Sequence, residues 1–198
     1  MERQSPKKKH TALQLLVLLA LLVVALILAL VVAKKLEMRT YKLNYPELIS
    51  KYSSEYAIDP YLVAAVIHCE SSNRETVVSR SGAIGLMQVM PETGEWIAGK
   101  LKIESFDPEA LKDPGTNIRF GCWYLCFLLE RYDGNIPNAV AAYNAGHGNV
   151  DKWLLDASIS NEGTLENIPF PETDQYVEKV QRAHEKYETL YPDAFKKA

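Results

Sequence analysis

The chain has 198 residues and a formal net charge of −3 at pH 7, with 24% of its residues charged. A charge so small and negative argues against a nucleic-acid-binding protein, because contact with phosphates requires a basic surface. Its three cysteines are an odd number, which excludes a framework made only of paired disulfides. We therefore interpret Cys69, Cys122 and Cys126 as small buried side chains.

A long apolar segment lies near the N-terminus. Residues 11–33 contain no charged side chain and consist almost entirely of Leu, Val, Ala and Ile. Since about 20 apolar residues in a helix cross a bilayer, this segment is predicted to be an uncleaved transmembrane anchor. A cleaved secretory signal is the alternative, because Val31-Val32-Ala33 tolerates cleavage. The apolar part of such a signal is usually shorter, about 7–15 residues.

Basic residues flank the apolar segment on both sides, so the positive-inside rule leaves its orientation undecided. Basic side chains next to a membrane are accounted for by the lipid headgroups. We expect five regions, of which the fourth is long enough to fold as a single domain. They are a basic tail at 1–10, the anchor at 11–33, a stalk at 34–44, the folded domain at 45–191 and a C-terminal tail at 192–198.

The folded domain is predicted to be all-α, with no paired strands. Asp59-Pro60 and Asp113-Pro114 each place a capping residue before a proline, which is typical of a helix start. Apolar residues recur at helical spacing behind both starts. The expected helices cover about 46–56, 60 to 70–73, 91–101, 114 to about 133, a short stretch at 140–143, and 173–191, and an irregular region with glycines covers 74–90.

Glu70 is the first candidate for chemistry. It follows the apolar residues Val66 and Ile67 at the end of the second expected helix. A carboxyl in such a place is partly desolvated, which raises its pKa. A general acid that works near neutral pH requires this raised pKa. The position alone is also explained by an exposed glutamate at a helix end.

Three further segments combine polar side chains with glycine or proline. Gly85–Gln88 carries a glutamine, which can donate to and accept from sugar hydroxyls. Ala142–Gly146 places a tyrosine and an asparagine at a helix end. The proline-rich segment 168–173 puts Glu172 in the first turn of the last helix, where the helix dipole favours an acidic residue. Taken singly, each segment is also explained by packing or capping.

Together and in this order, the four segments resemble the catalytic domain of the soluble-lytic-transglycosylase family, which has a goose-type-lysozyme-like helical fold. The resemblance rests on Glu70-Ser71, on Gly85–Gln88 and on Ala142–Gly146, and it includes the helix that begins at Asp113-Pro114. It extends over about residues 45–191, almost the whole of the expected domain. The implied fold is a lysozyme-like helical domain preceded by one transmembrane helix.

The resemblance also implies roles for individual residues. Glu70 matches the catalytic glutamate of the family. Positions that match the saccharide groove, or neighbour it, are Ser79, Gln88, Met90, Tyr143, Asn144 and Glu172. Asp174-Gln175 departs from the family, in which a basic and a polar residue often follow the glutamate–threonine pair. This departure leaves the local sugar contacts open.

The family implies cleavage of the β-1,4 bond between N-acetylmuramic acid and N-acetylglucosamine in peptidoglycan. One carboxyl acts first as acid and then as base, the sugar's own C6 hydroxyl attacks, and a 1,6-anhydro end results, with no metal or cofactor. Peptidoglycan lies outside the cytoplasmic membrane. The domain is therefore expected on the extracytoplasmic side of a single-pass bacterial membrane protein, with residues 1–10 in the cytoplasm.

Two other functions remain open. A hydrolytic muramidase on the same fold would need a second carboxylate to hold a water molecule. The acidic residues available to hold that water are Glu75, Glu92, Glu95 and Asp107. A non-catalytic wall-binding or assembly protein would keep the groove without using Glu70 as an acid. The product formed from cell walls and the effect of replacing Glu70 separate these functions.

Overall fold

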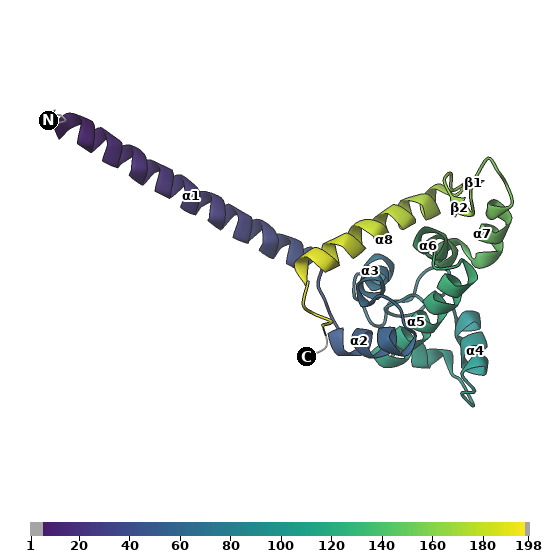
Figure 1. Ribbon diagram of the computed structural model, residues 1–198. Helices are drawn as coiled ribbons and strands as arrows, with labels where there is room; N and C mark the ends of the chain where they lie inside the picture. The colour runs from purple at the N-terminus through teal and green to yellow at the C-terminus, as the bar shows by residue number, and fades with distance from the viewer. Residues whose placement is uncertain (1–5, 197–198) are drawn as a thin grey trace. The chain divides into compact units, whose positions relative to one another are not determined.

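The computed structural model describes residues 6–196, in two units that divide between Thr40 and Tyr41. The described residues are predominantly helical (Figure 1). The elements are α1 (Pro6–Thr40), α2 (Pro46–Glu55), α3 (Pro60–Ser71), α4 (Pro91–Lys100), the 3-10 helix η1 (Pro108–Lys112), α5 (Pro114–Arg131), α6 (Ile136–Ala145), α7 (His147–Leu154), β1 (Ser160–Asn161), β2 (Thr164–Leu165) and α8 (Pro171–Leu190).

The first unit is the single helix α1. Its apolar side chains are exposed along its length, from Leu13 at 59% to Leu36 at 56%. By length and composition, Leu13–Thr40 is able to cross a membrane. The helix continues through residues 34–40 of the expected stalk, whereas residues 41–44 belong to the second unit. Of the expected basic tail, residues 1–5 lie outside the described residues.

The second unit is the predicted helical domain, and its helix starts follow the predicted chemistry. Asp59 Oδ1 accepts a hydrogen bond from the Tyr61 amide at 2.8 Å, which caps α3. Asp113 Oδ1 accepts from the Thr116 amide at 2.8 Å, which caps α5. A proline follows each cap, where its missing N–H costs no helical hydrogen bond. These two predicted starts are confirmed.

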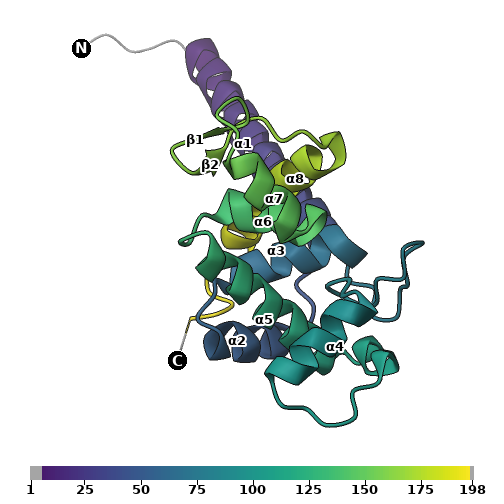
Figure 2. The ribbon, with the colours of Figure 1, turned by 90° about the vertical axis from the view of Figure 1, so that its right-hand side faces the viewer.

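The centre of the domain is α3. Its residues from Leu62 to Ile67 are at most 2% exposed, so that the helix is apolar around its whole circumference. Helices of this kind are stable only when other elements cover them. In this domain α3 packs mainly against α8 and α2, while α6 joins α5 to α8 (Figures 1 and 2).

The expectation that the domain has no paired strands was wrong. β1 and β2 form a small antiparallel hairpin, in which Ser160 pairs with Leu165 and Asn161 with Thr164. Its two turn residues, Glu162 and Gly163, have φ of 48° and 77°. Positive φ at both positions matches the twist of a tight hairpin. The strands are only two residues long, too short to show an alternating pattern.

Two helical elements were also not predicted, namely η1 and α7. In addition, α6 begins at Ile136, earlier than the predicted 140, because Asn135 Oδ1 accepts from the Asn138 amide at 3.0 Å and caps the helix there. The irregular region 74–90 contains isolated bridges, in which Ile84 pairs with Val78 and with Val89. This region is therefore a folded loop with defined backbone pairing.

One side chain fastens the 74–90 loop to the rest of the domain. Asn117 on α5 is fully buried, and its Oδ1 accepts from the Met87 amide at 2.7 Å. Its Nδ2 donates to the carbonyls of Ile84 and Leu111, both at 2.8 Å. Gly85 permits this approach, since a Cβ there would lie 2.3 Å from Asn117 Nδ2. The amide thus satisfies three backbone groups.

We predict that Asn117→Ala lowers the free energy of unfolding by about 2–4 kcal/mol, because it leaves buried backbone groups without partners. Denaturant titration of the full chain in detergent measures this change. Asn161→Ala is the matched control, since Asn161 is exposed on the hairpin, and a surface change of this kind is worth about 0.5 kcal/mol or less. Equal stability of the two variants would contradict the role given to Asn117.

Candidate active site

Glu70 lies at the end of α3 with its carboxyl largely enclosed by the domain. Burial raises its pKa from the ordinary 4.5 to about 7. The Tyr176 hydroxyl donates a hydrogen bond to Glu70 Oε1 at 2.6 Å, which favours the ionised carboxylate and acts in the opposite direction. Burial is the larger effect. Near neutral pH the carboxyl therefore exists in both protonation states, as a group that gives and takes a proton requires.

The local sequence explains this placement. Glu70 lies one turn after Val66 and Ile67, both fully buried. This part of α3 is therefore anchored in the core, and Glu70 continues from it. Ser71 is also buried, and its hydroxyl donates to the Ile67 carbonyl at 3.1 Å. Ser72 then ends the helix in the left-handed conformation, with φ of 52°. The carboxyl is thus held at the last turn of a buried helix.

Tyr143 on α6 is the second tyrosine near Glu70, after Tyr176. Its hydroxyl donates to the Met87 carbonyl at 2.8 Å, which links α6 to the 74–90 loop. Burial, with a smaller contribution from the nearby Glu70 carboxylate, holds the pKa of Tyr143 well above its ordinary value. The pKa of Tyr176 is raised for the same reasons. Both phenols are therefore neutral hydrogen-bond donors next to the carboxyl.

The loop presents Gln88 in a defined orientation. Its backbone has a φ of 48°, and its Nε2 donates to the carbonyls of Gly85 at 2.8 Å and Val77 at 3.2 Å. With both of these bonds made to its own loop, the amide oxygen is the atom left to accept from a ligand. Met87 beside it packs against α5, where a Cβ on Gly121 would lie 2.3 Å from the Met87 Sδ.

Ser79 and Met90 are placed less specifically. The Ser79 hydroxyl accepts from the Ala83 amide at 3.0 Å, within its own turn. Met90 is half-buried and directly precedes α4. Within residues 6–196, neither side chain hydrogen-bonds to Glu70, Tyr143 or Tyr176. Both are part of the loop that carries Gln88, and their role as groove residues stays a prediction.

Asn144 and Glu172 share a separate hollow between the end of α6 and the start of α8. The Thr173 hydroxyl donates to Asn144 Oδ1 at 2.7 Å and holds the two helix ends together. Glu172, by contrast, is exposed. The hollow is lined by Asn144, Ala145, Phe170, Pro171, Glu172 and Thr173. The structure thus brings together these two predicted residues, which follow Tyr143 and precede Tyr176 in the sequence.

Two residues of this site were not among the predicted ones, Tyr176 and Thr173. Thr173 belongs to the proline-rich segment 168–173, and helical spacing places Tyr176, which follows it, among the apolar positions of the last helix. The usable signal was spacing, because Thr173 and Tyr176 are three residues apart and share a helix face with each other. That face meets the ends of α3 and α6, as the bonds to Glu70 and Asn144 demonstrate.

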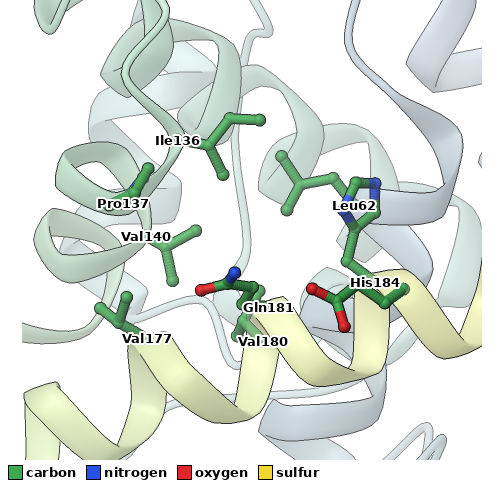
Figure 3. Close-up of a pocket in the computed structure, with 9 residues that line it drawn as sticks. Leu62, Ile136, Pro137, Val140, Val177, Val180, Gln181 and His184 are labelled. Atoms are coloured by element: carbon green, nitrogen blue, oxygen red, sulfur yellow. The ribbon is translucent and has the colours of Figure 1, made fainter.

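A more enclosed apolar hollow lies elsewhere in the domain, between α3, α6 and α8 (Figure 3). It is lined by Leu62, Ile136, Pro137, Val140, Val177, Val180, Gln181, His184 and Glu185. Leu62 stands near the start of α3, about 12 Å along the helix axis from Glu70. None of the predicted site residues lines it, so the hollow is separate from the carboxyl and its tyrosines.

One group of side chains in the described part of the chain has ligand atoms close enough for a metal ion. The atoms of Asp59, His184 and Glu188 lie within 4.8 Å of one another. His184 Nε2 already pairs with Asp59 Oδ2 at 2.5 Å, and this bond raises the pKa of His184 while it helps to lower that of Asp59. The group is accounted for as an ion pair between α8 and the start of α3.

A lysozyme-like helical domain with one buried carboxyl between two tyrosines is the class of structure that these features define. The chain belongs to the family described as Transglycosylase SLT domain, which matches residues 47–164. The match includes Glu70, Gln88 and Tyr143 but ends before α8. The family inferred from the sequence motifs is thereby confirmed, and so is the helical fold.

Named relatives agree with this assignment. The chain is 36% identical over 143 residues to the soluble lytic murein transglycosylase of Escherichia coli (strain K12), over 71% of the chain and 22% of that protein. It is 32% identical over 178 residues to membrane-bound lytic murein transglycosylase C of Yersinia pestis (strain Pestoides F), over 79% of the chain and 49% of that protein. The chain thus spans less than half the length of either relative.

A solved structure shares the fold. It is an inactive mutant, with glutamate replaced by glutamine, of the lytic transglycosylase Slt from Pseudomonas aeruginosa. The TM-score is 0.69 at 31% sequence identity, and the similarity covers 75% of this chain and 24% of that chain.

The buried carboxyl has a consequence for stability. Because its pKa is about 7 when folded and 4.5 ordinarily, protonated Glu70 stabilises the fold below about pH 4.5, and this contribution is lost as the pH rises through about 7. We predict that Glu70→Gln is more stable than the parent by about 3 kcal/mol at pH 8.5, with little difference at pH 4. Denaturant titrations at both pH values measure the gap.

The control replaces an exposed carboxyl by the same chemical change, as Glu172→Gln. Its difference from the parent is expected to stay small at both pH values. A Glu70→Gln gap that fails to widen between pH 4 and pH 8.5 would mean that the carboxyl is well solvated.

Proposed function

We propose that this protein is a membrane-anchored lytic transglycosylase of peptidoglycan. It cleaves the β-1,4 bond between N-acetylmuramic acid and N-acetylglucosamine and leaves 1,6-anhydro ends. The observation that carries the proposal is the Glu70 carboxyl, whose pKa of about 7 suits both proton donation and proton removal. The names of the relatives support the substrate, and the inactive glutamate-to-glutamine mutant supports a catalytic glutamate.

In the first step, protonated Glu70 gives its proton to the glycosidic oxygen, and the bond to C1 breaks as positive charge develops on the sugar. Glu70 is then ionised, and the hydrogen bond from Tyr176 stabilises that form. The adjacent carboxylate in turn stabilises the oxocarbenium-like sugar through its charge, within an enclosed site where such interactions are strong. The departing sugar leaves with the proton of Glu70 on its oxygen.

In the second step, ionised Glu70 takes the proton of the C6 hydroxyl of the same sugar, and that oxygen closes onto C1. The 1,6-anhydro ring forms and Glu70 is protonated again, so that one carboxyl completes the cycle. Tyr143, fixed by its bond to the Met87 carbonyl, forms the wall against which the sugar is oriented. Gln88, Asn144 and Glu172 supply polar contacts along the groove.

The electrostatics around Glu70 favour this reaction over hydrolysis. Burial and the Tyr176 bond account for the pKa of Glu70, and neither is a second carboxylate. Glu75 accepts a hydrogen bond from the Tyr45 hydroxyl, and Asp107 caps η1 through the Glu109 amide at 2.9 Å. The remaining candidates, Glu92 and Glu95, lie on the exposed face of α4.

We further propose that α1 is a single transmembrane anchor. Its length, its exposed apolar surface and the membrane-bound relative support this. Peptidoglycan as substrate requires the second unit to be extracytoplasmic, which places the N-terminal residues in the cytoplasm. The substrate thereby decides the orientation that the balanced basic flanks leave open.

The product decides between cleavage mechanisms. We expect the full chain in detergent to release muropeptides with 1,6-anhydro ends from purified cell walls. Mass spectrometry detects them as ends one water lighter than reducing ends. Reducing ends alone would establish a muramidase instead. Glu70→Gln is expected to lower the rate at least about a thousandfold, since it removes both proton transfers.

The same variant tests the non-catalytic alternative. Glu70→Gln that sediments with cell walls but does not cleave them is the expected result for an enzyme with an intact groove. If the parent binds walls equally well and also leaves them uncleaved, the protein is a wall-binding component. If Glu70→Gln cleaves as fast as the parent, Glu70 is not the catalytic residue.

Removal of the Tyr176 hydroxyl is expected to alter the pH profile. In Tyr176→Phe the carboxylate of Glu70 loses its donor, so the pKa of Glu70 rises above about 7. The alkaline fall in kcat/KM, which reports loss of the protonated acid, is then expected at higher pH than in the parent. A profile that changes in height without moving along the pH axis would contradict the bond's electrostatic role.

A further inference from the structure

A series of aromatic rings extends over α4 and α5. The Trp96 ring on α4 lies 5.0 Å from Trp123 and 5.1 Å from Phe127, both on α5, in edge-to-face geometry. Trp123 and Phe127 stack with an interplanar angle of 3° and centroids 5.9 Å apart. We call these three residues the aromatic shelf.

The shelf is continuous with the candidate active site. Phe127 lies 6.2 Å from the Tyr124 ring, which in turn lies 5.5 Å from the Tyr143 ring beside Glu70. A second connection runs through the backbone, because α4, which carries Trp96, starts directly after Met90. The shelf is therefore separated from Tyr143 by one ring, that of Tyr124, and is joined to the 74–90 loop through α4.

Packing between the two helices does not bury the shelf. Trp96 remains 38% exposed, and Trp123 and Phe127 are half-buried. Gly99, one turn after Trp96, leaves open space where a Cβ would otherwise stand. The hollow on this face of α4 is lined by Glu92, Glu95, Trp96, Gly99 and Lys100.

The chemistry of this surface matches a sugar ring. The C–H face of a pyranose packs against an aromatic ring, while its hydroxyl and acetamido groups need hydrogen-bonding partners around the edge. Lys100 Nζ lies over the Trp96 ring, 5.9 Å from its centroid, so it has to move off that face when a sugar stacks there, and it can then donate to the edge of the sugar. Glu92 and Glu95 supply acceptors on the same hollow.

We propose that the aromatic shelf is a distal saccharide subsite, at which Trp96 stacks against a sugar of the same glycan strand that Glu70 cleaves. The inference rests on the proposed function for the identity of the strand. The shelf lengthens the bound segment of glycan, so that strands long enough to reach Trp96 bind more tightly than short ones. It gives the protein a preference for long strands without contact to the scissile bond.

The test measures binding in the absence of cleavage. The full chain carrying Glu70→Gln, in detergent, is titrated calorimetrically with a length series of β-1,4-linked N-acetylglucosamine oligosaccharides. Added Trp96→Ala is expected to weaken binding of the longest oligosaccharides about tenfold, the loss expected for one aromatic contact. For the disaccharide the proposal predicts equal binding with and without the change, because a disaccharide bound beside Glu70 does not extend to a distal subsite.

Two further variants make the result specific. Trp96→Phe keeps a ring for stacking and is expected to restore most of the affinity for long oligosaccharides. Leu155→Ala removes another exposed apolar side chain, which is 88% exposed at the end of α7, and is expected to change nothing. Equal loss for all lengths in Trp96→Ala, or no loss for the long ones, would overturn the proposal.

The binding test of the aromatic shelf and the product test of the activity can fail separately. If the parent yields no anhydro ends from cell walls but its binding still depends on Trp96 and on oligosaccharide length, the shelf stands and the proposed activity fails. If the parent yields anhydro ends and Trp96→Ala binds every length as the parent does, the activity stands and the shelf fails.

Discussion

The hydrogen bond between Tyr176 and Glu70 is the contact on which the site depends. It joins residues 106 positions apart in the chain, and it sets the carboxyl between two opposing influences. Enclosure by α3 and its neighbours favours the neutral acid, whereas the phenol favours the carboxylate. Burial is the larger of the two effects, and together they give the carboxyl a pKa of about 7. The last helix, α8, therefore completes a site whose central residue, Glu70, lies on α3. The close packing of α3 against α8 maintains the hydrogen bond between the two helices.

The features that could be predicted from the sequence were those contained in short segments. The caps at Asp59 and Asp113, the apolar pattern of α3 and the glutamate at its end all follow from adjacent residues. The partner of that glutamate does not, because helical periodicity assigns Tyr176 to the apolar face without naming what it meets. Its hydroxyl matters only once α8 lies against the end of α3. The β1–β2 hairpin was not predicted for a different reason, because strands of two residues are too short to show an alternating pattern.

The 74–90 loop is held in place by hydrogen bonds between its backbone and side chains on α5 and α6. Asn117 and Tyr143 both bind backbone atoms of Met87, one from α5 and one from α6. Gln88 in turn holds the carbonyls of its own loop. The short motif thus specifies a backbone path, which the helices hold through hydrogen bonds to its backbone, while the Met87 side chain packs against Gly121. The sequence pattern located the loop but could not reveal its attachment by Asn117.

The close fit between Gly121 and Met87 has an evolutionary consequence. The missing side chain on α5 makes room for the sulfur of Met87, so the volume of one residue limits the volume of the other. A larger residue at position 121 can be accommodated only where position 87 carries a smaller one. Among natural variants of this domain, the two positions should therefore covary, one shrinking as the other grows, although they lie on different elements and neither touches the carboxyl.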